Sequence, residues 1–306
     1  MFESITTMEG EYVLSVFSPS TGRTRKVGPF KNLITNIGLN RIGTGGIALN
    51  MYVGTGGGVP AITDTSMFTL RAQTTGTRTA MNPAGAPTYH AIATFVATFD
   101  QGATSGNLTE VGVGWNDSPV NSIFSHALIV DGMGNPVTLT VLADEILTVT
   151  YILHCYTTLT DVTGTVTISG NDYDYIIRAC NQPVSNQAAA LLGVGASGQG
   201  SINPIAATTF SGNISAVTTE PTGNIGSINS FSGGTFVHPY VSNTLQIEGS
   251  FTFNITQGNG PSGTRTVSFA WPSLGTFQCQ FEPPIPKDNT KTMTFRFRWT
   301  WARHTP

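Results

Sequence analysis

The strongest constraint on the fold is a run of strict alternation at residues 147–156. Apolar side chains occupy every second position of this run: Leu147, Val149, Tyr151, Leu153 and Cys155. A period of two residues over ten positions is typical of a β-strand with one buried face. The run therefore predicts a β-strand whose apolar face packs on a core.

Two more strands are predicted just before this run. Residues 108–115 alternate after one irregular step, and residues 123–130 form a second apolar run. Turn residues separate the second strand from the third: Gly132, Gly134, Asn135 and Pro136. Gly and Asn tolerate positive φ, and Pro presets a negative one. Residues 107–156 are thus interpreted as three strands joined by turns.

The same plan returns near the C-terminus. Trp115 and Trp271 each end a predicted strand that follows a Gln-Gly and a Ser-Gly pair, and FSHAL at 124–128 has a counterpart in FQCQF at 277–281. The order and spacing of these positions indicate a repeat. The sequence predicts an all-β fold of two tandem β-sandwich domains of similar design, residues 1–160 and 161–306, in which Trp115 superposes on Trp271.

Each domain is expected to contain one short helix. Residues 32–43 suit a helix capped by Asn32 or Thr35 and ended by Gly43. Residues 185–192 (SNQAAALL) occupy the corresponding place in the second half.

The composition narrows the class of protein. The chain of 306 residues is 39% hydrophobic but only 10% charged, and its net charge is −3. Such a low charge content fits a subunit covered by neighbours in a large assembly, or an extracellular β-protein. It argues against a nucleic-acid partner, which needs a basic surface. Arg296 and Arg298 alternate with aromatic residues and are interpreted as the polar face of a strand.

We expect neither a membrane span nor a secretory signal. The sequence has no uninterrupted apolar run of about 18 residues, and its first twelve residues carry acids. Cys155, Cys180 and Cys279 are odd in number and lack metal-ligand spacing. They are interpreted as reduced thiols, buried or partly buried, in a protein made in a reducing cytoplasm.

Paired carboxylates are the first candidate for chemistry. Glu110 with Asp144 or Glu145 suggests the acid pair of a glycoside hydrolase. However, Glu110 lies within a strand, its counterpart near Thr266 is not acidic, and Asp144 and Glu145 open a strand, where acids are ordinary. No Ser-His-Asp set is marked by a nucleophile elbow. We predict no catalytic residues and no enzyme activity.

Two glycine-rich loops are the second candidate, VGTGGG at 53–58 and GVGASGQG at 193–200. A phosphate loop requires a following helix and a Lys-Ser/Thr pair. Neither loop has the lysine, so both are interpreted as turns. We predict no cofactor-binding residues.

Metal-ligating residues are the third candidate. The five histidines are scattered in the sequence: His90, His126, His154, His238 and His304. Asp172 and Asp174 offer oxygen ligands for Ca²⁺, but the loop pattern of a calcium site is absent. We predict no metal site.

Aromatic residues supply a binding alternative. The last predicted strand is rich in them: Phe295, Phe297, Trp299 and Trp301. Alignment with residues 147–155 places them on the core face. Residues 235–240, with Phe236, His238 and Tyr240, are the more exposed candidate for contact with a receptor or carbohydrate.

Several segments together resemble structural proteins of tailed bacteriophages, often described as tail-fibre or minor tail proteins. They are NLITNIGL at 32–39, VGTG at 53–56 with TDT at 63–65, LTEVG at 108–112, FSHAL at 124–128 and VLADEILTVTY at 141–151. The resemblance covers about the first half and has no catalytic residues to carry over. It implies a virion component without enzymatic activity, made in the bacterial cytoplasm. Heptads, collagen-like triplets and β-helix repeats are absent, which favours a compact protein over a fibre shaft.

The expected function is therefore structural. We expect an adaptor, tail-tip or fibre-attachment protein near the adsorption apparatus, located in the virion tail. Its partners would be other tail proteins, copies of itself in a symmetric homo-oligomer, and a host surface glycan or receptor. Three alternatives remain: a capsid decoration or head-fibre protein, a receptor- or carbohydrate-binding module, and a glycan-degrading enzyme.

Overall fold

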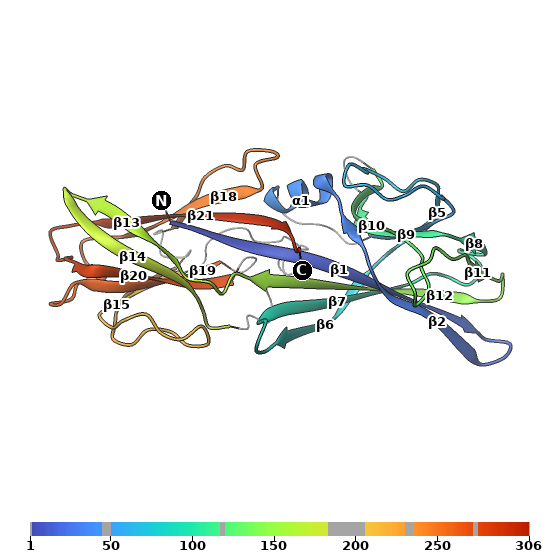
Figure 1. Cartoon of the computed structure of the whole chain (residues 1–306), viewed down its shortest axis with the longest axis horizontal. Coiled ribbons are helices and arrows are strands. Elements are labelled where there is room, and N and C mark those ends of the chain that lie inside the picture. Colours follow the sequence, from blue (N-terminus) through green and yellow to red (C-terminus); the bar gives the residue numbers. More distant parts are fainter. Residues whose placement is uncertain are drawn as a thin grey trace.

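The computed structural model describes residues 2–44, 50–116, 120–182, 206–229, 235–271 and 275–305. This part is mostly β-structure with one helix, in an elongated molecule (Figure 1). The prediction of a β-fold is confirmed. The elements are β1 (Phe2–Ser18), β2 (Arg23–Lys31), β3 (Leu33–Ile34), α1 (Asn36–Gly43), β4 (Asn50–Gly54), β5 (Leu70–Thr75), β6 (Thr77–Ala84), β7 (His90–Thr98), β8 (Gly106–Leu108), β9 (Glu110–Trp115), β10 (Ser122–Leu128), β11 (Leu139–Val141), β12 (Ile146–Thr157), β13 (Val162–Ile168), β14 (Asn171–Cys180), β15 (Ala206–Phe210), β16 (Asn224–Asn229), β17 (Thr235–Val237), β18 (Gln246–Phe253), β19 (Thr264–Trp271), β20 (Gly275–Ile285) and β21 (Met293–Arg303).

The strands form four sheets. The largest has the order β17-β18-β21-β1-β12-β7-β6, with β2 paired to β1. A five-stranded sheet, β3-β10-β9-β4-β5, and a six-stranded sheet, β13-β14-β20-β19-β15-β16, lie toward opposite ends of the molecule (Figure 1). A small sheet pairs β11 with β8.

Strand β1 runs through the middle of the molecule and joins its two ends (Figure 1). Residues 6–17 pair antiparallel with β12, and residues 2–8 pair parallel with β21. Phe2 packs at one end against three aromatic rings, with centroid distances of 5.0 to 5.5 Å: Tyr175, Phe281 and Phe297. The largest sheet is therefore continuous across position 160, where the predicted domain boundary lies between β12 and β13.

The alternating run at 147–156 forms most of β12, and its five apolar side chains are fully buried. The aromatic face of β21 is buried as well. Trp301 donates its indole N–H to the carbonyl oxygen of Leu39 at 2.8 Å, which ties β21 to α1. Both predictions of a core-facing strand are confirmed.

Helix α1 begins after Thr35, whose hydroxyl accepts the backbone N–H of Gly38 at 2.9 Å, and it ends at Gly43. Gly38 disfavours a helix by propensity, yet packing requires it. A Cβ there would lie 2.4 Å from the carbonyl oxygen of Phe124 on β10. The second predicted helix, 185–192, and the glycine loop 193–200 lie outside the described residues.

Two predicted strands are broken. The strand at 108–115 is interrupted at Thr109, whose N–H and hydroxyl bond to the carbonyl oxygens of Gly54 and Gly56. The sequence also predicts a strand at residues 68–78, and this segment divides at Gly76 into β5 and β6, which belong to different sheets. The side chain of Trp271 lies outside the description, so its overlay on Trp115 stays a prediction.

The three cysteines are free and buried, as predicted. Burial raises the pKa of all three thiols, that of Cys180 to about 12. These thiols are therefore held in the protonated, unreactive form. In the described part of the chain, the helix is too short to cross a membrane.

We expect Phe2→Ala to destabilise the chain by about 3 to 5 kcal/mol, because it empties a closed aromatic cluster. Phe17→Ala is the matched control on the same strand, since the Phe17 side chain is 40% exposed and that of Phe2 only 5%. Urea unfolding of both variants measures the difference. Equal shifts of the midpoint would show that the first residues of β1 are not anchored.

Candidate functional site

Glu110 opens β9, a strand in which all six residues are buried. Its carboxylate has no exposed surface. A buried charge is costly unless partners compensate it. The surroundings of Glu110 are therefore the first place to look for a site.

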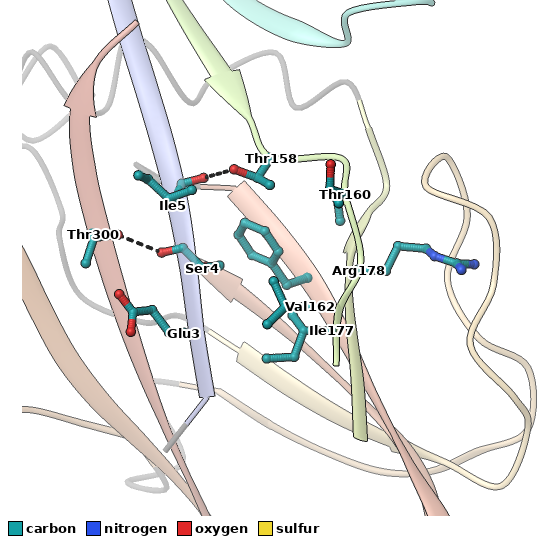
Figure 2. A pocket seen from close by; sticks show the side chains of 11 residues that line it. Glu3, Ser4, Ile5, Thr158, Thr160, Val162, Ile177, Arg178 and Thr300 are labelled. Atoms are coloured by element: carbon teal, nitrogen blue, oxygen red, sulfur yellow. Dashed lines mark hydrogen bonds between the residues drawn. The ribbon is translucent and has the colours of Figure 1, made fainter. Parts of the chain in front are cut away.

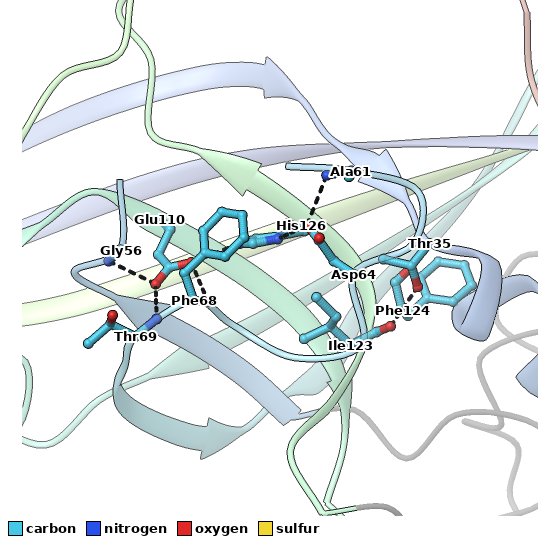
Figure 3. Close-up of polar contacts among 10 residues, drawn as sticks. All are labelled: Thr35, Gly56, Ala61, Asp64, Phe68, Thr69, Glu110, Ile123, Phe124 and His126. Atoms are coloured by element: carbon cyan, nitrogen blue, oxygen red, sulfur yellow. Dashed lines mark hydrogen bonds and ion pairs between the residues drawn. The ribbon is translucent and has the colours of Figure 1, made fainter. Parts of the chain in front are cut away.

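The carboxylate of Glu110 is bonded by the loop that joins β4 to β5 (Figure 3). Oε1 accepts the backbone N–H groups of Gly56 at 2.9 Å and Thr69 at 2.8 Å, and Oε2 accepts that of Phe68 at 3.0 Å. Glu110 thus fixes both ends of residues 55–69, which we call the β4–β5 loop.

His126 on β10 is clamped between two carboxylates (Figure 3). Nε2 lies 2.8 Å from Oε2 of Glu110, and Nδ1 lies 2.8 Å from Oδ2 of Asp64 in the β4–β5 loop. Ionised carboxylates only accept hydrogen bonds, so both ring nitrogens carry a proton and the ring is an imidazolium.

The pKa directions agree with this ion cluster. Burial alone would lower the pKa of His126, but the bonds from Glu110 and Asp64 outweigh it and raise that pKa. Burial alone would raise the pKa of Glu110, but His126 and the three loop amides outweigh it and lower that pKa. The cluster carries one positive and two negative groups, which we call the Glu110–His126–Asp64 network.

Gly54 at the end of β4 and Gly56 in the β4–β5 loop are required by close approach to this carboxylate. A Cβ on Gly54 would lie 2.3 Å from Oε1 of Glu110, and one on Gly56 would lie 2.6 Å from the same oxygen. The loop was interpreted above as a turn. It does cradle an anion with backbone N–H, but the anion is the chain's own carboxylate.

The hydrogen bonds of Glu110 and His126 are made to groups of the chain itself. His126 is fully buried, both its nitrogens are occupied, and the Phe68 ring covers it at a centroid distance of 4.7 Å. No serine or cysteine is bonded to the ring in the described residues. The arrangement is suited to holding a loop in place.

The other carboxylates considered above are used separately. Glu145 pairs with Arg25, with 2.8 Å between Oε2 and Nη2, and accepts the N–H of Leu142 at 2.7 Å. Asp144 accepts a hydrogen bond from the Ser20 hydroxyl at 3.0 Å. Glu110 and Glu145 therefore have different partners and different structural tasks.

Three of the histidines, scattered in the sequence, are brought together by the largest sheet. His90, His154 and His304 gather around Tyr156, with ring centroids of His304 and His90 at 3.9 and 4.6 Å from the tyrosine. Burial lowers the pKa of His90 and His154, which favours neutral rings. Contacts between β7, β12 and the end of β21 create this cluster, and no local spacing could have indicated it.

The remaining candidates are also engaged. Asp172 and Asp174 accept hydrogen bonds from Thr167 and Thr165 at 2.6 and 2.8 Å. Among the described residues, no three acidic, histidine or cysteine side chains are grouped to hold a metal ion. Tyr240 packs on Trp301 at 5.7 Å and donates to Asn40 at 2.9 Å, so it is not a free contact residue.

The sequence did contain a signal for the network. Residues 110–115, EVGVGW, have no polar face after Glu110, so the glutamate had to be buried and paired. The identity of its partners could not be derived, because Asp64 and His126 lie 46 and 16 positions away from it.

Comparison with known proteins gives no relative: no protein-family model matches the chain, and neither a curated protein nor a solved structure matches it.

Glu110→Gln should destabilise the chain by about 3 to 5 kcal/mol, since it removes one member of a buried charge cluster. It should also make residues 55–69 the first site of limited proteolysis. Glu248→Gln is the control, because Glu248 pairs with Arg298 on a partly exposed face. This substitution should lower the free energy of unfolding by at most about 1 kcal/mol. An unchanged proteolytic pattern in the Glu110 variant would contradict the proposed role of the loop contacts.

The network also predicts a pH dependence. The pKa of His126 is raised by folding, so its stabilisation is complete below about pH 6.5, the unfolded value, and is lost as the pH rises through the folded value. The pKa of Glu110 is lowered, so its stabilisation is present above about pH 4.3 and is lost on further acidification. The network should therefore stabilise the folded chain most between about pH 4.3 and about pH 6.5.

The measurement is the free energy of unfolding against pH, with His126→Gln and the control His238→Gln. Only the first variant should remove the fall in stability above about pH 6.5. Ring resonances of His126 that titrate below that value would contradict the assignment of an imidazolium.

Proposed function

We propose that this chain is a non-enzymatic structural component of a bacteriophage tail, an adaptor, tail-tip or fibre-attachment protein near the adsorption apparatus. It acts through contacts with other tail proteins and with copies of itself. It is made in the bacterial cytoplasm and carried in the virion tail.

One observation carries the proposal: four of the five segments that resemble tail proteins lie in or beside the Glu110–His126–Asp64 network, whereas residues 141–151 lie apart, where Glu145 pairs with Arg25. Thr35 caps α1, and its hydroxyl donates to the carbonyl oxygen of Ile123 at 2.7 Å, beside the network (Figure 3). Within the network, Glu110 contacts His126, the N–H of Gly56 donates to Glu110, and Asp64 contacts the other side of the His126 ring. The residues that carry the resemblance thus hold a loop in place, as we expect of a structural subunit.

The surface supports the same proposal. Apolar side chains of the β4–β5 loop are turned to solvent, with Val59 84% and Ile62 44% exposed. Glu110 binds both ends of that loop, so these side chains are presented on a fixed support. Exposed apolar groups on a rigid loop favour a protein neighbour over a soluble substrate.

We also propose that the chain consists of two tandem β-sandwiches of one design. The sheet β3-β10-β9-β4-β5 and five strands of the six-stranded sheet, β14-β20-β19-β15-β16, have the same strand order when these strands are ranked along each half, and β13 is an addition in the second half. The triplets β6-β7-β12 and β17-β18-β21 also correspond within the largest sheet. These matching orders support a duplication.

The loop contacts of the two halves support it further. In the second half, the loop after β15 is held by Gln280, whose Oε1 accepts the N–H of Ile214 at 2.7 Å, and by Gln278, whose Oε1 accepts that of Ser215 at 2.8 Å. Thr266 donates to the carbonyl oxygen of Gly212 in the same loop at 2.7 Å. Neutral side chains from β19 and β20 thus do what Glu110 and His126 do on β9 and β10.

A carbohydrate- or receptor-binding module is the second candidate, and the Tyr156 cluster is the observation that favours it. His90, Tyr156 and His304 are only partly buried on the outer face of the largest sheet. Aromatic groups of this kind can pack on sugars. Glycan binding that is lost in Tyr156→Ala would favour this candidate.

The proposed function is tested by immunogold electron microscopy of phage particles with antibody to this chain. We expect gold at the tail or its tip. Gold over the capsid would instead support a capsid decoration or head-fibre protein. No labelling with an accessible epitope would contradict a virion role.

A further inference from the structure

The edge strands of the sheets differ in how they are protected against pairing. Natural edges carry charge or proline to prevent addition of another strand. Arg25 and Lys26 protect β2, Arg71 protects β5, and Arg78 with Pro83 protects β6. Strand β13, with the sequence VTGTVTI, has neither charge nor proline.

Strand β13 is also open along its outer edge. It pairs with β14, and no other described strand pairs with it. Ser169 and Gly170 form a two-residue turn with φ of 51° and 83°. In such a hairpin the flanking residues Ile168 and Asn171 bond to each other. Every second residue back from Ile168 therefore bonds to β14, and the N–H and C=O groups of Thr163, Thr165 and Thr167 point away from it.

The inward face of β13 borders two depressions in the surface. Val166 and Ile168 line one of about 390 Å³, together with Phe2, Thr294, Phe295 and Arg296. A second depression of about 330 Å³ has Ile5 on one side and Val162 and Ile177 on the other (Figure 2). Val162 is 39% exposed. A strand added to β13 would place its inward side chains next to these surfaces.

We propose that β13 pairs with β13 of a second copy of this chain, antiparallel and centred on Thr165. In that register Val162 faces Ile168, Gly164 faces Val166, and Thr163 faces Thr167 of the other copy. All seven residues overlap, and apolar side chains meet on the inner face while threonines meet on the outer face. Such like-with-like cross-strand pairs are favourable.

The charges near the edge fit a second copy. Asp161, which precedes β13, is held by Arg178 with 2.6 Å between Oδ2 and Nη2. In the proposed register it lies opposite Ser169 of the partner, so no like charges meet. Strand β16, at the other edge of the same sheet, is less suitable: its pairing with β15 is irregular, and Gly258 packs closely against Gly226 at its centre.

The dimer joins two six-stranded sheets into one of twelve strands about a two-fold axis, since each copy contributes six. It closes on itself and leaves the β4–β5 loops for other partners. The role of this dimer in an assembly rests on the proposed function. The dimer itself is measured on the purified chain, so the two proposals can fail separately.

The first test is sedimentation velocity of the purified full chain over a range of concentrations. We expect a monomer–dimer equilibrium that Thr165→Lys weakens at least about tenfold, because two lysines would then lie opposite each other. Circular dichroism confirms that the variant is folded. The control Ser227→Lys places the same charge on exposed β16 and should leave the equilibrium unchanged. A wild-type chain that is monomeric at all concentrations, or equal effects of both variants, would overturn the proposal.

A second test reads the register and does not depend on the lysine variant. Thr165→Cys should form an intermolecular disulfide on oxidation, because opposed residues have Cα atoms about 5.5 Å apart. Thr163→Cys should not, since it faces Thr167 of the partner. The three native cysteines are buried, so the wild-type chain gives the background level of crosslinking. Equal crosslinking at both positions, or none at Thr165, would overturn the register.

Discussion

The pairing of β1 with both β12 and β21 is the constraint on which the whole molecule depends. Its residues 6–17 lie against β12 and its residues 2–8 lie against β21, so the largest sheet passes through both ends of the molecule without a break. One alternation of buried residues therefore runs along nearly the whole of β1. Leu14 and Val16 are buried at one end and Phe2 at the other, and only the small Gly10 leaves room for Tyr151 between them.

Buried polar groups set the positions of the loops on this frame. A carboxylate within an apolar strand is costly in isolation, but here three backbone N–H groups and an imidazolium satisfy it. The same contacts explain why Gly54 and Gly56 have no room for a side chain. Removing His126 would leave Glu110 with its three backbone N–H bonds but without its cationic partner, so the members of the cluster support one another.

The sequence predicted the regular parts of this structure and missed the long-range ones. Period-two alternation located β12 and β21, and Thr35 with Gly43 located α1, because these signals are local. The first residues of β1 were missed since Ser4 and Thr6 occupy buried positions and break the apolar alternation. The Glu110–His126–Asp64 network and the histidine cluster depend on which strands become neighbours, and a single sequence does not specify that pairing.

The β-framework presents a fixed β4–β5 loop and an open edge at β13. We infer that β1 unites both ends of the molecule in one cooperative unit. Hydrogen–deuterium exchange of the intact chain tests this most directly. We predict that peptides covering residues 2–8 exchange as slowly as those covering residues 9–17, because both are held within one sheet. Rapid exchange confined to residues 2–8, as in a frayed terminus, would contradict the claim and leave the two ends of the molecule independent.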